Sequence, residues 1–233
     1  MKKEKFRRNI SVKKIIFIFL RGSIILGSGY GVLDQIGIFR GIFNGQQLMY
    51  YTILSNSLVS IFYILLSISH IKQKKRTNHK ALLDINKNVK GAFTMMILVT
   101  GIIYHIILVP TLSDTSQYGL YTFSNFLVHT YVPGAVFLDW VLFTPIKTVK
   151  KLEPFKWLII PLSYWILSIM YASLKIPFFQ TESYYAYFFI DNNALGWPKT
   201  LMNIFILSIF FLVIGYFLII VKVIEYWINE FKT

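Results

Sequence analysis

Six apolar runs, each long enough to cross a bilayer as a helix, dominate the chain. A helical span needs about 20 predominantly apolar residues. The composition agrees, since 55% of the 233 residues are hydrophobic, only 15% are charged, and the mean hydropathy is +0.57. We therefore predict an all-α polytopic membrane protein, a six-transmembrane-helix bundle that forms a single membrane domain over residues 1–233. The predicted spans are residues 14–33, 48–71, 91–110, 123–145, 156–175 and 200–227.

Basic residues gather in alternate connecting segments and set the predicted orientation. They are concentrated in the N-terminal tail, in residues 72–90 and in residues 147–156, whereas the intervening segments hold few. Because lysine and arginine are enriched on the cytoplasmic side of a membrane, we predict that both termini are cytoplasmic. The net charge of +14 is then a topology signal and a contact for anionic membrane lipids, and it gives no reason to expect a nucleic-acid partner.

Three groups capable of proton or nucleophile chemistry fall at a similar depth below the outer surface. At 1.5 Å per residue, Thr52 lies about 6 Å inside the second span and His129 about 9 Å inside the fourth. On the same scale, His105 lies about 8 Å below the outer end of the third span. Polar side chains in a membrane helix face the bundle interior or a cavity. We therefore expect these residues to share one layer of the outer leaflet.

Helical phase places further polar groups with this layer. The fourth span carries Asn125 and His129 one turn apart on a shared face. Asp139 lies much deeper and is not expected to reach the same site, and Arg21 is expected to snorkel toward the cytoplasmic head groups. The second span has a stripe of polar residues spaced three or four apart, which consists of Thr52, Asn56, Ser60, Tyr63 and Ser67.

This layer contains the groups that acyl transfer requires. A threonine hydroxyl becomes a nucleophile when a base takes its proton, and histidine is the usual base near neutral pH. Thr52 would attack an ester carbonyl, and either His129 or His105 would shuttle the proton before water releases the acyl group. Asn56 or Asn125 would orient the imidazole or donate to the oxyanion. Substrates with long acyl chains would reach such a site laterally from the lipid.

Other interpretations of the same residues remain open. A lone threonine in a membrane helix usually bonds its own i−4 carbonyl or a neighbouring helix. His105 and His129 would need a third ligand to hold zinc, and no paired histidine motif supports that, so we expect no metal and no cofactor. The acidic candidates for that ligand are Asp34, Asp114, Glu182 and Asp191. A non-enzymatic lipid or small-molecule transporter, or a ligand-binding membrane sensor, is the main functional alternative.

Several motifs resemble one known family. YYTILSNSLV in the second span, TGIIYHIILVP in the third, LVHTYVPGAVFLDWVLF in the fourth and FFIDNNALGWPKTLMNIF near the sixth are similar, in order and spacing, to the androgen-induced protein and androgen-dependent TFPI-regulating protein family. The likeness extends from about Gly22 to the sixth span and is nearest to the bacterial six-span branch, which implies a bacterial plasma membrane.

The resemblance implies an activity and two catalytic residues. Animal members are threonine hydrolases that cleave fatty acid esters of hydroxy fatty acids, so the resemblance implies a lipid ester substrate. Their nucleophile matches Thr52 and their essential histidine matches His129, which favours His129 over His105 as the base. The TILSN pattern after Thr52 differs from that of animal members, and different substrates are therefore expected.

An unusually aromatic segment, KIPFFQTESYYAYFFIDNNALGW, separates the last two spans. Tyrosine and phenylalanine are enriched at membrane interfaces, so we expect this segment to form an interfacial belt. The alternative is that residues 176–197 cap the site as a lid, with Asp191 or Asn192 reaching the imidazole.

Overall fold

The computed structural model describes residues 2–73, 81–111, 122–145, 150–178 and 183–231. Within these ranges the chain is helical and contains no strand. Three of the long segments are single helices: α1 (Lys2–Gln35), α2 (Tyr51–Gln73) and α10 (Trp197–Glu230). The third span consists of α3 (Ala81–Ile103), η3 (Tyr104–Leu108) and α4 (Val109–Thr111), and the fourth of α5 (Phe123–Phe126), η4 (Leu127–Tyr131) and α6 (Val132–Phe143). The fifth consists of α7 (Glu153–Trp157) and α8 (Ile159–Ala172). Short helical turns are η1 (Ile38–Arg40), η2 (Gly45–Met49), η5 (Phe188–Ile190) and α9 (Asn192–Leu195).

Six segments of the described chain are long and apolar enough to cross a membrane, which confirms the predicted all-α six-helix bundle and indicates a multi-pass membrane protein. Much of their outward surface is apolar, as contact with lipid requires. On α10, for example, Phe205, Val213 and Phe217 are all exposed. Several helices are longer than the predicted spans and extend beyond their ends. The fifth membrane segment, for example, begins at Glu153, and Pro154 lies in the first turn of α7.

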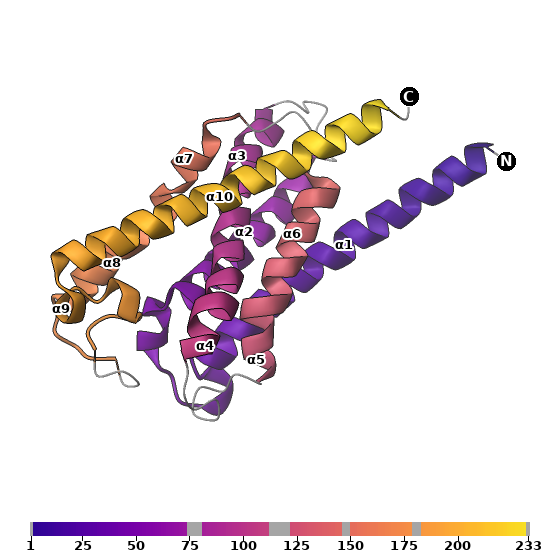
Figure 1. Ribbon diagram of the computed structural model, residues 1–233. Coiled ribbons are helices and arrows are strands. Elements are labelled where there is room, and N and C mark those ends of the chain that lie inside the picture. The colour runs from indigo at the N-terminus through magenta and orange to yellow at the C-terminus, as the bar shows by residue number, and fades with distance from the viewer. Residues whose placement is uncertain (1, 74–80, 112–121, 146–149, 179–182, 232–233) are drawn as a thin grey trace.

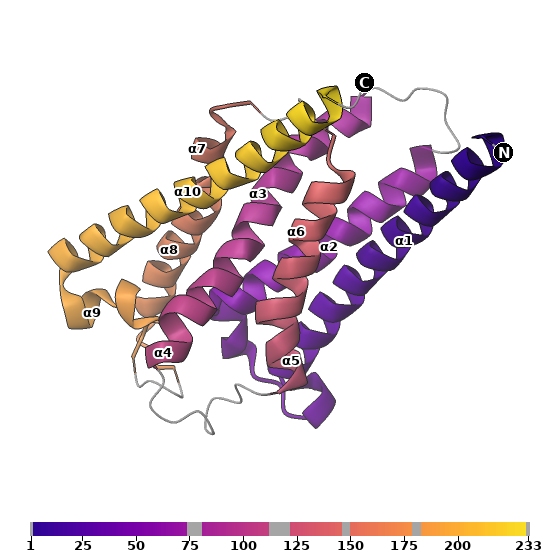
Figure 2. The same ribbon diagram turned by 45° about the vertical axis from the view of Figure 1, so that its right-hand side comes forward.

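Four helices, α1, α2, α3 and α6, pack against one another and form the centre of the bundle (Figure 1). Helices α7 and α10 pack on the side of α3, and α8 joins them there (Figure 2). The N-terminal end of α1 and the C-terminal end of α10 lie at the same side of the bundle in both views. This arrangement leaves the space between α2, α3, α8 and α10 for a site.

Small residues allow α1 to approach the fourth span closely. Ser23, Gly27 and Gly31 recur every fourth residue, a spacing that places them on one face of a helix. A Cβ on Gly31 would lie 2.5 Å from the side chain of Val128, far inside van der Waals contact. The backbone of α1 therefore lies directly against η4, which carries His129.

A buried ionic cluster joins the four central helices. The Asp139 carboxylate of α6 is fully buried and accepts hydrogen bonds from Arg21 Nε of α1, at 3.1 Å, and from the Tyr63 hydroxyl of α2, at 3.1 Å. The ammonium group of Lys90 on α3 forms an ion pair with the same carboxylate and donates to the Asp139 carbonyl oxygen. Arg21 also lies over the ring of Phe17, 3.9 Å from its centroid.

Two expectations about these residues are wrong. Arg21 does not snorkel to the head groups, because it is 5% exposed and paired with Asp139. Lys90, counted among the cytoplasmic loop cations, is likewise only 5% exposed. A carboxylate deep in an apolar bundle is stable only when cations and hydrogen-bond donors compensate it, and these two cations supply that compensation.

Neutralising Asp139 tests the role of the cluster. Asp139→Asn removes the charge but keeps the shape, which leaves Arg21 and Lys90 buried without a counter-ion. We expect a loss of about 3–5 kcal/mol in the free energy of unfolding. Thermal and denaturant unfolding of the purified protein in detergent measures it. Asp34→Asn, a change at a partly exposed carboxylate, is the matched control and should stay within about 0.5 kcal/mol of the parent. Equal stabilities of the two variants would contradict this role.

Candidate active site

Thr52 and His129 meet in the interior of the bundle. Thr52 lies in the first turn of α2 and His129 in η4, and the distance from Thr52 Oγ1 to His129 Nε2 is 3.1 Å. Each residue is 7% exposed. The two residues are 77 positions apart in sequence, so their contact depends on how α2 packs against the fourth span. This is hydrogen-bond geometry between a hydroxyl and a potential base.

The backbone of the fourth span fixes which imidazole nitrogen accepts a proton. Nδ1 of His129 lies 3.1 Å from the carbonyl oxygen of Asn125. A carbonyl oxygen only accepts, so Nδ1 carries a hydrogen, and in the neutral imidazole Nε2 is left as the acceptor. The Thr52 hydroxyl therefore donates to Nε2. His129 is thus oriented as a base toward Thr52, with Asn125 acting through its backbone.

Two π-helical turns build this contact. Residues Tyr104–Leu108 and Leu127–Tyr131 both form i→i+5 turns within otherwise α-helical spans, and such turns are frequent at functional sites. They bring Tyr104 over His129, with ring centroids 3.7 Å apart and planes inclined by 18°. The Asn125 side-chain amide donates to the Tyr104 hydroxyl. The imidazole is therefore held by a stacked ring on one face and by hydrogen bonds at both nitrogens.

Asn56 joins α2 to η4 one turn below Thr52. Its amide nitrogen donates to the Thr52 carbonyl oxygen at 2.9 Å and to the Val128 carbonyl oxygen at 3.1 Å. Asn56 is fully buried and is not a hydrogen-bond partner of either imidazole nitrogen. It therefore fixes the spacing between the two helices that carry Thr52 and His129.

His105 lies elsewhere. Its ring is exposed on the outer surface of the bundle, and its Nε2 is 3.0 Å from the Thr130 hydroxyl. The neighbouring residue in the same π turn, Tyr104, takes the position beside His129 instead. Because a π turn rotates successive side chains differently from an α turn, depth alone could not choose between positions 104 and 105.

No group of three metal-ligating side chains occurs among the described residues. Asp114 and Glu182, two of the candidate third ligands, lie outside the described ranges. Within those ranges, Asp34 and Asp191 do not contact either histidine, and both nitrogens of His129 already have hydrogen-bond partners.

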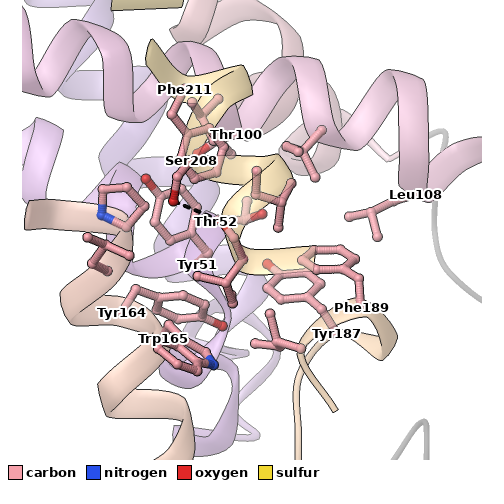
Figure 3. A pocket seen from close by; sticks show the side chains of 17 residues that line it. Tyr51, Thr52, Thr100, Leu108, Tyr164, Trp165, Tyr187, Phe189, Ser208 and Phe211 are labelled. Carbon is pink, nitrogen blue, oxygen red and sulfur yellow. Dashed lines mark hydrogen bonds between the residues drawn. The ribbon is translucent and has the colours of Figure 1, made fainter. Parts of the chain in front are cut away.

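A largely apolar cleft opens beside Thr52 (Figure 3). The empty space between its walls is about 610 Å³, which includes space open to the surroundings of the protein. The walls come from α2, α3, α8, α10 and the segment before α9. Its polar or aromatic lining residues are Tyr51, Thr52, Thr100, Tyr164, Trp165, Tyr187, Phe189, Ser208 and Phe211. His129 does not line the cleft, so Thr52 stands between the cleft and the imidazole.

The aromatic segment between α8 and α10 covers this cleft. Tyr185 and Tyr187 are buried, and Phe189 and Ile190 reach the cleft lining with Tyr187. The expected interfacial belt is therefore wrong for these side chains, which pack inward. Phe188, in contrast, is 55% exposed.

The alternative for this segment was a lid that reaches the imidazole through an acid or amide. The segment does cover the cleft, but neither Asp191 nor Asn192 reaches the imidazole. Asp191 caps α9 by accepting from the backbone N–H groups of Asn193 and Ala194, and its other oxygen accepts from Ser183. It therefore has a local structural role and does not contact His129. Asn192 is not a hydrogen-bond partner of the imidazole either, because Thr52 and Asn125 occupy both ring nitrogens.

Four aromatic residues of this site were not predicted: Tyr51, Tyr104, Tyr164 and Tyr187. The tyrosine pair before Thr52 and the tyrosine beside His105 stood within the quoted motifs, so proximity in sequence was an available signal. Tyr187 lies in the aromatic segment for which a lid over the site was the alternative, but the sequence did not single it out within that segment. Tyr51 stacks edge-on against Tyr164, with ring centroids 5.0 Å apart.

Comparison of the chain with models of protein families, with curated proteins and with solved structures finds no match. The resemblance to the androgen-induced protein family therefore stays a prediction.

A glycine in α3 provides a test of how closely the two spans must approach. A Cβ on Gly101 would lie 2.8 Å from the His129 carbonyl oxygen and 3.1 Å from the Pro133 side chain. Gly101→Ala should therefore push η4 away from α3 and lower the free energy of unfolding by about 1–3 kcal/mol.

The control is Gly134→Ala, because nothing lies within 4 Å of a Cβ at that position on α6. This change should be neutral or stabilising by up to about 1 kcal/mol, since alanine is the better helix former. Unfolding of both variants in detergent measures the difference, and equal effects of the two changes would contradict the close approach at His129.

Proposed function

We propose that this protein is an integral membrane hydrolase that cleaves lipid esters, such as fatty acid esters of hydroxy fatty acids, through a Thr52–His129 dyad. The observation that carries the proposal is the buried contact from Thr52 Oγ1 to the unprotonated Nε2 of His129, at the wall of an apolar cleft. A nucleophile hydrogen-bonded to a base, with that base oriented by a third group, is the general arrangement of covalent acyl transfer.

The first half of the proposed reaction forms an acyl-threonine. Thr52 Oγ1 bonds to the ester carbonyl carbon while its proton moves to His129 Nε2, and the carbonyl electron pair moves onto oxygen. The C–O bond to the alcohol then breaks as the imidazolium returns its proton to the leaving oxygen. The Asn125 carbonyl holds the Nδ1 hydrogen throughout and stabilises the transient positive charge.

Water completes the reaction by the same route in reverse. His129 takes a proton from a water molecule that attacks the acyl carbonyl, and the proton then passes to Thr52 as the fatty acid leaves. The cleft that Thr52 lines has room for a water molecule.

The character of the cleft supports a lipid substrate. Aliphatic and aromatic side chains from α3, α8 and α10 form most of its wall, so an acyl chain would replace no well-bound water there. We infer the outer leaflet of a bacterial plasma membrane as the location, with both termini cytoplasmic.

A transporter or sensor is the second candidate, and the packing below the site argues against a transporter. Among the described residues, a tightly packed layer that includes Val59, Met96 and Val136, each at most 1% exposed, lies between the level of Asn56 and the Asp139 cluster, and no residue of that cluster lines the cleft. A transported polar solute needs a hydrated path, which this layer does not supply.

Replacement of the two proposed catalytic residues tests the function. Thr52→Ala should abolish labelling by a fluorophosphonate probe, because the attacking oxygen is gone. His129→Gln should lower ester hydrolysis by about 10²–10⁴-fold, the usual contribution of a general base. Ser57→Ala is the matched control, because its hydroxyl lies on the same helix and bonds only the Ile53 carbonyl oxygen. Labelling that survives Thr52→Ala would refute the nucleophile assignment.

The absence of cysteine from the sequence makes the proposed orientation directly testable. A single cysteine at exposed Phe39, between the first two spans, should react with a membrane-impermeant maleimide in intact bacterial cells. A cysteine at exposed Lys150, between the fourth and fifth spans, should react only after the cells are permeabilised. The reverse pattern would place the site in the inner leaflet.

A further inference from the structure

Acyl transfer through Thr52 requires a hydrogen-bond donor for the oxyanion, and the two asparagines expected to supply it are engaged elsewhere. The Asn56 amide nitrogen donates to two backbone carbonyl oxygens, and the Asn125 amide nitrogen donates to the Tyr104 hydroxyl. Neither residue lines the cleft. The donor must therefore come from a polar group that reaches the cleft itself.

Most polar groups of the cleft wall are also committed or turned away from Thr52. The hydroxyl groups of Thr100, Tyr164 and Ser208 each donate to a backbone carbonyl oxygen. The Tyr51 hydroxyl and the Trp165 indole N–H are buried without a hydrogen-bond partner. Consecutive residues of a helix point about 100° apart, so the Tyr51 ring leaves α2 in a different direction from Thr52. The Trp165 indole nitrogen is directed away from Thr52 (Figure 3).

Tyr187 differs from these residues in its position. Its side chain enters the cleft from the segment before η5, and its hydroxyl is directed toward Thr52 (Figure 3). The Thr52 hydroxyl and the backbone N–H groups of Tyr51 and Thr52 lie within reach of this phenol oxygen. Those two N–H groups belong to the first turn of α2, where the helix itself supplies no acceptor.

Aromatic contacts hold the Tyr187 ring in this orientation. It stacks on Phe189, with centroids 5.3 Å apart and planes inclined by 9°, and it meets the ring of Tyr50 edge-on at 5.9 Å. Tyr187 as a whole is 9% exposed. Burial raises the pKa of the Tyr187 phenol, and the nearby polar groups of Thr52 and Tyr51 offset this only in part. At neutral pH the phenol therefore keeps its proton and can donate a hydrogen bond.

We propose that Tyr187 is a catalytic residue of this site, whose phenol donates a hydrogen bond to the oxyanion formed when Thr52 attacks the ester. This inference rests on the proposed function. As the Thr52–carbon bond forms and the Thr52 proton passes to His129, the carbonyl electron pair moves onto oxygen and meets the Tyr187 O–H. The phenol proton stays on Tyr187 throughout. Hydrogen bonds from the nearby N–H groups of Tyr51 and Thr52 to the phenol oxygen would strengthen its O–H as a donor.

The experiment compares Tyr187→Phe with the parent and with Tyr185→Phe, all purified in detergent. Hydrolysis of 4-methylumbelliferyl fatty acyl esters gives kcat and KM, and a fluorophosphonate probe gives the rate of labelling at Thr52. We expect Tyr187→Phe to lower kcat by about 10²–10³-fold, as loss of one oxyanion donor does, with KM within about threefold of the parent. The labelling rate should fall in parallel, because the phosphonyl oxygen would use the same donor.

Tyr185→Phe removes a hydroxyl from the same segment but outside the cleft, so its kcat should equal that of the parent. An active parent and a Tyr187→Phe variant within threefold of it would overturn the role of Tyr187 and leave the proposed function standing. A parent that neither hydrolyses esters nor labels at Thr52 would overturn both proposals.

A second variant covers the case in which Tyr187→Phe does not fold. Incorporation of 3,5-difluorotyrosine at position 187 keeps the ring and its contacts but makes the phenol more acidic. If the phenol must be protonated to act, the alkaline limb of the kcat profile should move to lower pH. A hydroxyl that only caps α2 would leave the profile of the fluorinated protein unchanged, and that result would overturn the inference.

Discussion

The burial of one carboxylate, Asp139, constrains how the four central helices pack. An isolated charge in an apolar bundle is strongly unfavourable, so Asp139 is stable only where Arg21, Lys90 and Tyr63 converge on it from α1, α3 and α2. This convergence fixes the rotation and depth of each helix relative to α6. The same helices carry Thr52 on α2 and, through η4, His129, so the ionic cluster also sets the frame within which the outer site is assembled.

The same desolvation constraint shapes the outer site. Each polar group of the Thr52–His129–Asn125 chain has a partner, and the order of donors and acceptors follows from the carbonyl oxygen at one end. The π turns of the third and fourth spans offset the side chains so that Tyr104 stacks on the imidazole and the Asn125 carbonyl oxygen reaches Nδ1. The result is a neutral, oriented imidazole facing a hydroxyl at the edge of an apolar cleft, which is the arrangement that the proposed ester hydrolysis uses.

Hydrophobic run length and helical phase were sufficient to predict the six helices and the inward stripe of α2, of which Thr52, Asn56 and Tyr63 are buried. Depth within the spans placed Thr52 and His129 at one level, and the two side chains do meet. Depth could not exclude His105, because a π turn changes which of two neighbouring side chains faces inward. The charge pattern along the chain also led to the wrong prediction that Arg21 and Lys90 lie at the cytoplasmic surface. Each of these buried cations pairs with a carboxylate about 50 or more residues away in the chain, and a local pattern does not reveal such a partner. The position of Tyr187 depends on how the segment after α8 returns to α2, which no local pattern in the sequence records.

Mass spectrometry of the protein during turnover tests the central claim, that Thr52 is acylated by a lipid ester. The protein is mixed with a fatty acyl ester, quenched in acid within the first turnovers, and digested for peptide analysis. The account predicts a fatty acyl adduct on Thr52 that appears in the parent, decays as free fatty acid forms, and is absent from Thr52→Ala. Hydrolysis without any adduct on Thr52, or an adduct on another residue with the same kinetics, would contradict it.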